Sequence, residues 1–388
     1  MLLAAETLLT GAELLRPGWI DVAEGTVHAV GAGAPPGAAD HQLAVVVPGF
    51  VDTHLHGGGG ANFSAASAQE TATAAALHRR HGTTTLIASL VTAGPDELLR
   101  QVRSLAAEVR AGVLAGIHLE GPWLSVHRCG AHQPALMRDP DPAEIDRVLA
   151  AADGAVKMVT LAPERDGAPA AIAQLTAAGV VAAVGHTEAG YAQARSAIDA
   201  GATVGTHLFN AMRPIDRREP GPVVALLEDA RVTVELITDG VHIDPAIYRF
   251  VTRSVGAQRV SLITDAMAAT GMSDGRYELG PLGVDVVDGV ARVAGTDTIA
   301  GSTATMDRVF RFAVAHSGLA RDAALLQAVA QSSINPARAL GLPANELKPG
   351  ATADLVALDQ DLAVTGVLHR GAWVPNGAPF NGLGPLGA

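Results

Sequence analysis

Short apolar runs rich in β-branched residues alternate with helix-like stretches from about residue 48 to about residue 265. Eight of these runs predict strands, which end near His56, Ser89, Glu120, Ala162, His186, His207, Asp239 and Asp265. The stretches between them open with Asp or Pro and close near Gly, the expected start and stop signals of helices, as in residues 95–112, 141–154 and 244–256. Eight strands, each followed by a helix or a long loop, predict an α/β fold of the (β/α)8 TIM-barrel class. A doubly wound open sheet is the alternative.

The two ends of the chain do not follow this alternation. Residues 1–46 and 347–388 read as short strands and turns, and we expect them to pair into one small β-sandwich domain beside a barrel of residues 47–346. A further irregular segment, residues 276–294, resembles a hairpin inserted after the eighth strand. Asp288 and Gly289 would form its turn, because this dipeptide favours the tight turns of hairpins.

Residues that can bind metal lie at the carboxyl ends of the predicted strands, the end at which a parallel barrel places its active site. They are His54, His56, Glu120, His186, His207 and Asp265. Histidine and carboxylate ligands suit zinc- or iron-type divalent cations, and the lack of cysteine ligands argues against a closed structural zinc site. We therefore expect a catalytic metal centre that binds a divalent cation; the family resemblance given below implies one or two such cations per subunit.

Two details of the pattern refine this ligand set. His54 and His56 stand one residue apart in an extended run, so their side chains share one face of the strand, and the glycines at 57–60 let the backbone turn sharply after them. His118 precedes Glu120 by two residues and shares its strand face, which makes it a competing ligand. We rank Glu120 higher because it lies nearer the strand end.

Composition narrows the class of protein. The chain has 388 residues, of which 48% are apolar and 17% charged, as in a globular protein. A net charge of −12 without any lysine or arginine run argues against nucleic acid as a partner. The single cysteine, Cys129, excludes a disulfide framework and fits a reducing compartment. No apolar run is long enough to span a membrane, and the first residues lack the basic start of a signal peptide. We expect a cytoplasmic protein that does not bind membranes.

Seven segments carry a resemblance to a known family. In chain order they read HLHGGGG, HLEGPWLSVHRCGAH, VGHTEA, GTHLFNAMRPIDRREPG, ITDGVH, LITDAM and AGSTATM. Together they resemble the N-acetylglucosamine-6-phosphate deacetylase family of the amidohydrolase superfamily. This resemblance implies a metal-dependent hydrolase of a linear amide that converts the phosphosugar N-acetyl-D-glucosamine 6-phosphate to D-glucosamine 6-phosphate and acetate, in amino-sugar catabolism and cell-wall recycling.

The resemblance also implies roles for the residues of the metal centre. Glu120, His186 and His207 would be the ligands that every family member needs. His54 and His56 correspond to a pair that supports a second metal and that some members lack. Asp265 would touch a metal and act as general acid and base, and it could accept a proton from the attacking water and pass it to the amine.

Further residues would contact the substrate if the resemblance holds. His132 would lie near the acetyl carbonyl, where a hydrogen-bond donor holds developing negative charge. The other implied contacts are Ala131, Asn210, Ala211, Arg218, His242 and the loop of Ala304, Thr305 and Met306, in which the family more often has leucine at 304. Among them, Arg218 offers a planar fork for phosphate oxygens. His242 would come from the neighbouring subunit of a homodimer.

Two other interpretations stay open at this point. Cyclic-amide hydrolases bridge two metals with a carboxylated lysine at a strand end. Lys157 and Lys348 are the only lysines, and one lies deep in a predicted strand while the other lies in the tail. The second interpretation is a barrel that has lost catalysis and acts as a scaffold. Such proteins usually lose ligands, whereas this sequence keeps all six.

Overall fold

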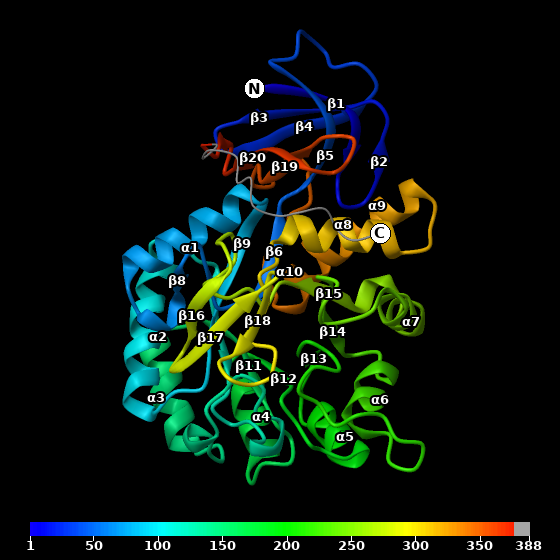
Figure 1. Cartoon of the computed structure of the whole chain (residues 1–388). Helices are drawn as coiled ribbons and strands as arrows, with labels where there is room; N and C mark the ends of the chain where they lie inside the picture. The colour runs from blue at the N-terminus through cyan, green and yellow to red at the C-terminus, as the bar shows by residue number, and fades with distance from the viewer. Residues whose placement is uncertain (376–388) are drawn as a thin grey trace.

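The computed structural model describes residues 1–375, and its centre is a parallel eight-stranded sheet that curves into a barrel (Figure 1). The strands are β6 (Phe50–Leu55), β9 (Thr83–Leu90), β10 (Gly116–Glu120), β11 (Val156–Leu161), β12 (Val181–Val184), β13 (Val204–Gly205), β14 (Thr233–Ile237) and β15 (Val260–Ile263). Each strand pairs with the next one along the chain. A parallel bridge between Leu55 and Ala266 joins the first strand to the end of the last. The predicted (β/α)8 barrel is confirmed, and the open sheet is not.

Helices surround the barrel, as Figure 1 shows. They are α1 (Ala68–Arg80), α2 (Pro95–Arg110), α3 (Pro142–Ala152), α4 (Ala168–Ala177), α5 (Tyr191–Asp199), α6 (Gly221–Glu228), α7 (Pro245–Val255), α8 (Met306–His316), α9 (Arg321–Val329) and α10 (Asn335–Ala339). The expected start signals operate in α3 and α7, where Asp141 and Asp244 accept hydrogen bonds from backbone amides of the first turn and a proline follows each. The apolar faces of these helices and of the strands form one large core.

Both ends of the described chain build a second sheet above the barrel in Figure 1. Its strands are β1 (Leu2–Leu9), β2 (Leu14–Leu15), β3 (Gly18–Ala23), β4 (Thr26–Ala32), β5 (His41–Pro48), β19 (Leu355–Leu358), β20 (Val364–His369) and β21 (Ala372–Trp373). Strand β5 joins the two ends, because it pairs with β1 in parallel and with β19 in antiparallel orientation. The sheet has its own cluster of buried side chains, among them Leu3, Ile20 and Leu368. We propose the boundaries near 46 and 347, and residues 376–388 lie outside the described part.

An inserted antiparallel sheet follows β15, as the hairpin signal indicated. It contains β16 (Gly275–Leu279), β17 (Leu282–Val287) and β18 (Val290–Val293). Asp288 and Gly289 form the turn between the last two strands, with φ of 53° and 72°. The sequence prediction did not separate β16 as a third strand. Its Leu279 packs with Met267 in a small core shared by the insertion and the segment after β15.

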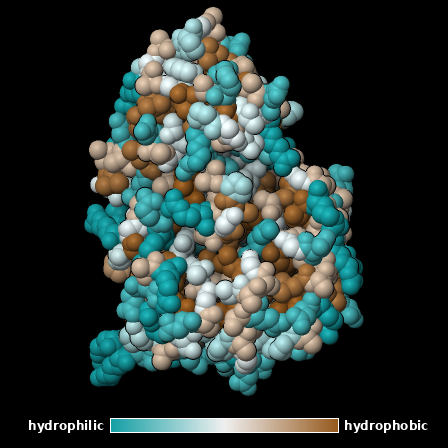
Figure 2. Space-filling model, turned by 180° about the vertical axis from the view of Figure 1, so that it is seen from behind, coloured by the Kyte–Doolittle hydropathy of each residue, from teal (hydrophilic) through white to brown (hydrophobic). Residues whose placement is uncertain are grey.

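Among residues 1–375, no helix is long and apolar enough to cross a bilayer. On the face seen in Figure 2, hydrophobic residues are interspersed with hydrophilic ones.

A candidate metal centre at the carboxyl end of the barrel

The barrel strands deliver all six expected ligands to one place. His54 lies in β6, His56 directly follows that strand, and Glu120 is the last residue of β10. His186, His207 and Asp265 each lie two residues beyond a strand, and their φ angles of 46°, 28° and 50° are in the left-handed region. Non-glycine residues adopt this region at a cost of about 1–3 kcal/mol each, and such residues cluster at functional sites. The strained backbone turns these three side chains toward the barrel mouth.

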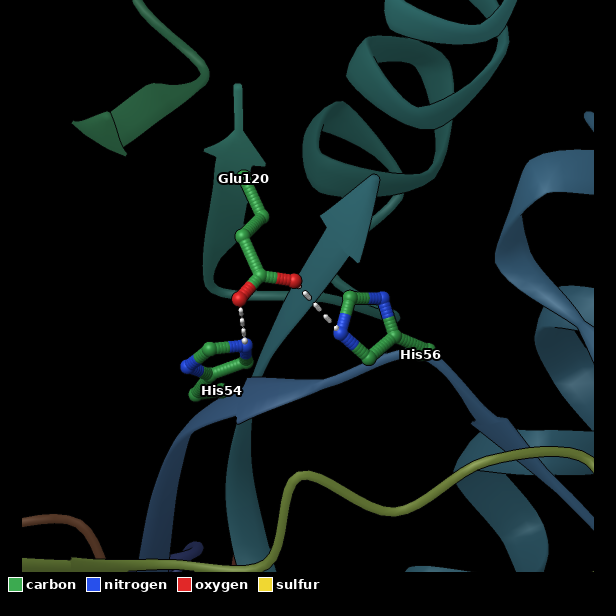
Figure 3. A group of neighbouring side chains, drawn as sticks. All are labelled: His54, His56 and Glu120. Atoms are coloured by element: carbon green, nitrogen blue, oxygen red, sulfur yellow. Dashed lines mark ion pairs between the residues drawn. The ribbon is translucent and has the colours of Figure 1, made fainter. Parts of the chain in front are cut away.

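The Glu120 carboxylate is the centre of the group. Its Oε1 lies 2.9 Å from His207 Nε2 and 3.0 Å from His186 Nε2. His56 Nε2 lies 3.1 Å from Oε2, and His54 Nε2 lies 3.5 Å from Oε1. Figure 3 shows these last two rings reaching from β6 toward the two oxygens of Glu120. One buried carboxylate thus faces these four imidazoles, and a fifth, that of His132, lies 3.2 Å from its Oε2.

The positions of the donor atoms suit a shared divalent cation better than direct hydrogen bonds between the rings. His186 Nδ1 lies 2.9 Å from the Arg128 carbonyl oxygen, which can only accept, so Nδ1 carries the proton and Nε2 presents a lone pair. That Nε2 lies 3.1 Å from His207 Nε2. Ligands of one tetrahedral cation at about 2.0–2.1 Å are about 3.3 Å apart, close to this separation.

A second group of donors lies beside the first. His54 Nε2 is buried and has no hydrogen-bond partner. Asp265 Oδ1 lies 3.6 Å from this atom and 3.2 Å from His56 Nε2. Glu120 lies between the two groups. With His186 and His207 it can hold one cation, and with His54, His56 and Asp265 it offers donor atoms for a second.

The electrostatics of the group favour positive charge. Burial raises the pKa of Asp265, but His54 and His56 outweigh burial and lower this pKa to about 2. Burial likewise raises the pKa of Glu120, and the imidazoles led by His54 hold it well below its usual value. In turn, burial lowers the pKa of His56, but hydrogen bonds to Asp265 and Glu120 raise it to about 9. Both carboxylates are therefore ionised at neutral pH.

His132 lies against the six expected ligands, which we call the metal group, and its hydrogen bonds define the tautomer of its ring. The Thr92 backbone N–H donates to its Nδ1 at 3.1 Å, so Nε2 carries the proton of the neutral ring. This Nε2 lies 3.2 Å from Glu120 Oε2. Burial lowers the pKa of His132 to about 4, and the ring is therefore neutral at neutral pH. It is a hydrogen-bond donor at the edge of the metal group.

The two competing residues are engaged elsewhere. His118 is buried with Nδ1 2.9 Å from Ser89 Oγ and Nε2 2.8 Å from Thr160 Oγ1, so hydroxyls occupy both nitrogens. Lys157 is the second residue of β11, and its Nζ donates to the Gly154 carbonyl at the amino end of the barrel. Neither the competing ligand nor the bridging lysine of a cyclic-amide hydrolase is present at the metal group.

A cavity of about 510 Å³ opens over the metal group and brings several predicted substrate contacts together. Its lining includes the ligands His56, Glu120, His186, His207 and Asp265, and also Ala131, His132, Asn210, Ala211 and His242.

The remaining predicted contacts lie outside this lining. Arg218 is exposed on the loop before α6, and Ala304, Thr305 and Met306 are buried at the start of α8. Their roles stay predictions.

Sequence reasoning missed some neighbours of the site. Glu235 in β14 contacts the His54 ring, and Thr92 holds the His132 ring. An acid in the middle of the apolar strand run of residues 231–239 was a signal for Glu235. Leu279 and residues 297–299 of the insertion line the cavity, but nothing in their sequence marks them.

Comparison with known proteins agrees with this geometry. The amidohydrolase family model matches residues 45–383. The chain belongs to the amidohydrolase family.

Three similar proteins narrow the comparison. The chain is 73% identical to an aspartate-to-alanine mutant of N-acetyl-D-glucosamine-6-phosphate deacetylase from Mycobacterium smegmatis, solved in complex with N-acetyl-D-glucosamine 6-phosphate, with a TM-score of 0.96 over 97% of this chain and 99% of that one. It is 39% identical over 350 residues to N-acetylglucosamine-6-phosphate deacetylase of Danio rerio, covering 84% of this chain and 85% of the relative. It is also 35% identical over 370 residues to N-acetylgalactosamine-6-phosphate deacetylase of Escherichia coli O157:H7, covering 92% and 96%.

Proposed function

We propose that this protein hydrolyses the acetamide of N-acetyl-D-glucosamine 6-phosphate to D-glucosamine 6-phosphate and acetate, in the cytoplasm, within amino-sugar catabolism and cell-wall recycling. The convergence of Glu120, His186 and His207 beside Asp265 and His132 is the observation that carries the proposal. Similarity to the Mycobacterium smegmatis enzyme over nearly the whole chain supports this substrate. N-acetylgalactosamine 6-phosphate is the second candidate, because one relative is named for it.

The residues present can perform this hydrolysis. A divalent cation of zinc or iron type, held by Glu120, His186 and His207 and in a second position by His54 and His56, would polarise the acetamide carbonyl and lower the pKa of water to about 7. Asp265, ionised at the cavity floor, accepts the proton of the attacking water and passes it to the departing amine. His132 donates its Nε2–H to the carbonyl oxygen as negative charge develops there.

We further propose that the enzyme works as a homodimer, and that His242, which in this structure lines the cavity of its own chain, reaches the neighbouring active site and contacts phosphate. Val241, Ile247 and Phe250 are large apolar side chains exposed near His242 and on α7, and they offer a surface for a second copy. Burial lowers the pKa of His242, but the Asp239 carboxylate 2.7 Å away outweighs burial and raises it. A raised pKa favours the protonated ring, which suits a phosphate oxygen.

Acetate release distinguishes the two candidate sugars. We expect the purified protein, after chelation and re-addition of zinc or ferrous iron, to deacetylate N-acetyl-D-glucosamine 6-phosphate with a kcat/KM at least about tenfold above that for the galactose epimer, because tenfold corresponds to only about 1.4 kcal/mol of transition-state binding. A preference for the epimer would identify the second candidate as the substrate. Full activity in the chelated protein would contradict the metal-dependent mechanism.

Replacing Asp265, the proposed proton carrier, tests proton transfer and metal binding separately. We expect Asp265→Asn to lower kcat by about 10²–10⁴-fold, the usual contribution of a general acid and base. Glu120, His186 and His207 remain, so the variant should stay folded and keep its cation at this group, as elemental analysis would measure. Turnover near that of the unchanged protein would refute the role of Asp265.

The predicted phosphate contact is tested with two substrates. We expect Arg218→Ala to raise KM for N-acetyl-D-glucosamine 6-phosphate by about tenfold or more, because a charge-assisted contact to phosphate is lost. KM for unphosphorylated N-acetylglucosamine should change little. The exposed Arg217→Ala is the matched control, and equal effects of Arg218→Ala on both sugars would remove its phosphate role.

Mixed dimers test the position of His242. Asp265→Asn and His242→Ala, each of low activity alone, are combined and allowed to exchange subunits. If His242 acts in the neighbouring site, one site of each mixed dimer contains both mutations and the other contains neither. A mixed dimer then has half the activity of the unchanged protein, so an equimolar mixture returns to roughly a quarter after random exchange. If His242 acts in its own chain, every site keeps one mutation and activity does not return.

A further inference from the structure

Glu235 is a buried carboxylate that lies behind the metal group. It belongs to β14, and its side chain is 2% exposed. Its Oε1 accepts a hydrogen bond from Thr53 Oγ1 at 3.1 Å, and its Oε2 lies 3.4 Å from His54 Nδ1. Across residues 1–375, His54 is the only basic side chain within 4.0 Å of this carboxylate.

A buried carboxylate without a positive partner is costly, so its position calls for a compensating charge. The His118 ring, whose centroid lies 4.5 Å from that of His54, does not provide it, because hydroxyls engage both of its nitrogens. Compensation therefore has to come through His54.

The two nitrogens of His54 face opposite ways. Nδ1 faces Glu235, whereas Nε2 faces Glu120 at 3.5 Å and Asp265 at 3.6 Å and has no hydrogen-bond partner. A carboxylate at Nδ1 fixes the proton there, directs the Nε2 lone pair to the opposite side and makes it a stronger ligand.

The first group of donors lacks such a carboxylate. His186 donates its Nδ1 proton to the Arg128 backbone carbonyl, and His207 Nδ1 is buried without a partner. Glu235 thus acts on the side of His54 and His56 alone. This asymmetry links Glu235 to the cation position beside His54 and His56 and not to the position beside His186 and His207.

We propose that Glu235 is a positioning residue that makes His54 a ligand and so enables the chain to hold a second divalent cation, bound by His54, His56, Glu120 and Asp265. The proposal rests on the metal-dependent function above. It adds that the Glu235 carboxylate determines whether the chain binds one cation or two. The buried negative charge of Glu235 offsets the second cation, and the Thr53 hydroxyl holds the carboxylate in place.

Cation counting tests this role without any sugar. Purified protein is stripped with a chelator and titrated with Zn²⁺ by calorimetry, and bound zinc is measured by elemental analysis after dialysis. We expect two cations per chain in the unchanged protein. Glu235→Gln should keep the first and bind the second about 10–100-fold more weakly, the usual effect of losing a partner of a metal-ligating histidine.

Two controls separate this role from general destabilisation. Asp307→Asn removes another buried carboxylate partner of a histidine, His81, at 3.2 Å and away from the cavity, and it should leave both cations in place. His54→Gln should lose the second cation as Glu235→Gln does, and the double variant should lose no more. If Glu235→Gln does not fold, Glu235→Asp, which keeps the charge on a shorter side chain, should weaken the second cation and spare the first.

The possible results are distinct. Two cations of unchanged affinity in Glu235→Gln, or only one in the unchanged protein, would overturn the inference. Loss of both cations in Glu235→Gln would also overturn it, because the effect would not be specific to the His54 side. If the unchanged protein binds two cations and Glu235→Gln one, but no acetate is released from the phosphosugar, the proposed function fails and the role of Glu235 stands.

Discussion

The arrangement of the site depends on one ionised carboxylate, that of Glu120. It is buried at the end of β10 with imidazole nitrogens at both of its oxygens. Burying a charge is costly unless it is paired. A divalent cation would satisfy the carboxylate and the lone pairs of the rings together. The strained backbone at His186, His207 and Asp265 turns these side chains toward the position where we propose that cation.

The barrel strands position the expected ligands, and the loops and the insertion after β15 form the rest of the cavity. Parallel strands fix the ligands, since their carboxyl ends converge at one face of the barrel. The loop after β10 supplies Ala131 and His132, and the insertion after β15 closes another side of the cavity with Leu279. The small sheet made by both chain ends has its own core, and its strands contribute no residue to the described lining of the cavity. A substrate of the proposed kind would therefore be bound by loops while its amide meets fixed ligands.

The ligands could be predicted from the sequence because their signal is local. An apolar strand run followed by a histidine or an acid predicts both the strand and a polar residue at its end, and the structure places Glu120, His186, His207 and Asp265 at such ends. Residues that act through a partner distant in the chain are harder to find. Glu235 is 181 positions from His54, and only the closed barrel brings them together. The expected placement of Arg218 and of Ala304–Met306 at the substrate depends on the resemblance, and in this chain they lie outside the cavity lining.

Anomalous X-ray scattering at the zinc edge, from crystals grown with Zn²⁺, tests the central claim most directly. The account predicts a strong peak about 2.0–2.2 Å from a Glu120 oxygen and from Nε2 of both His186 and His207. A map without a peak there at saturating zinc, with these three side chains still in mutual contact, would contradict it.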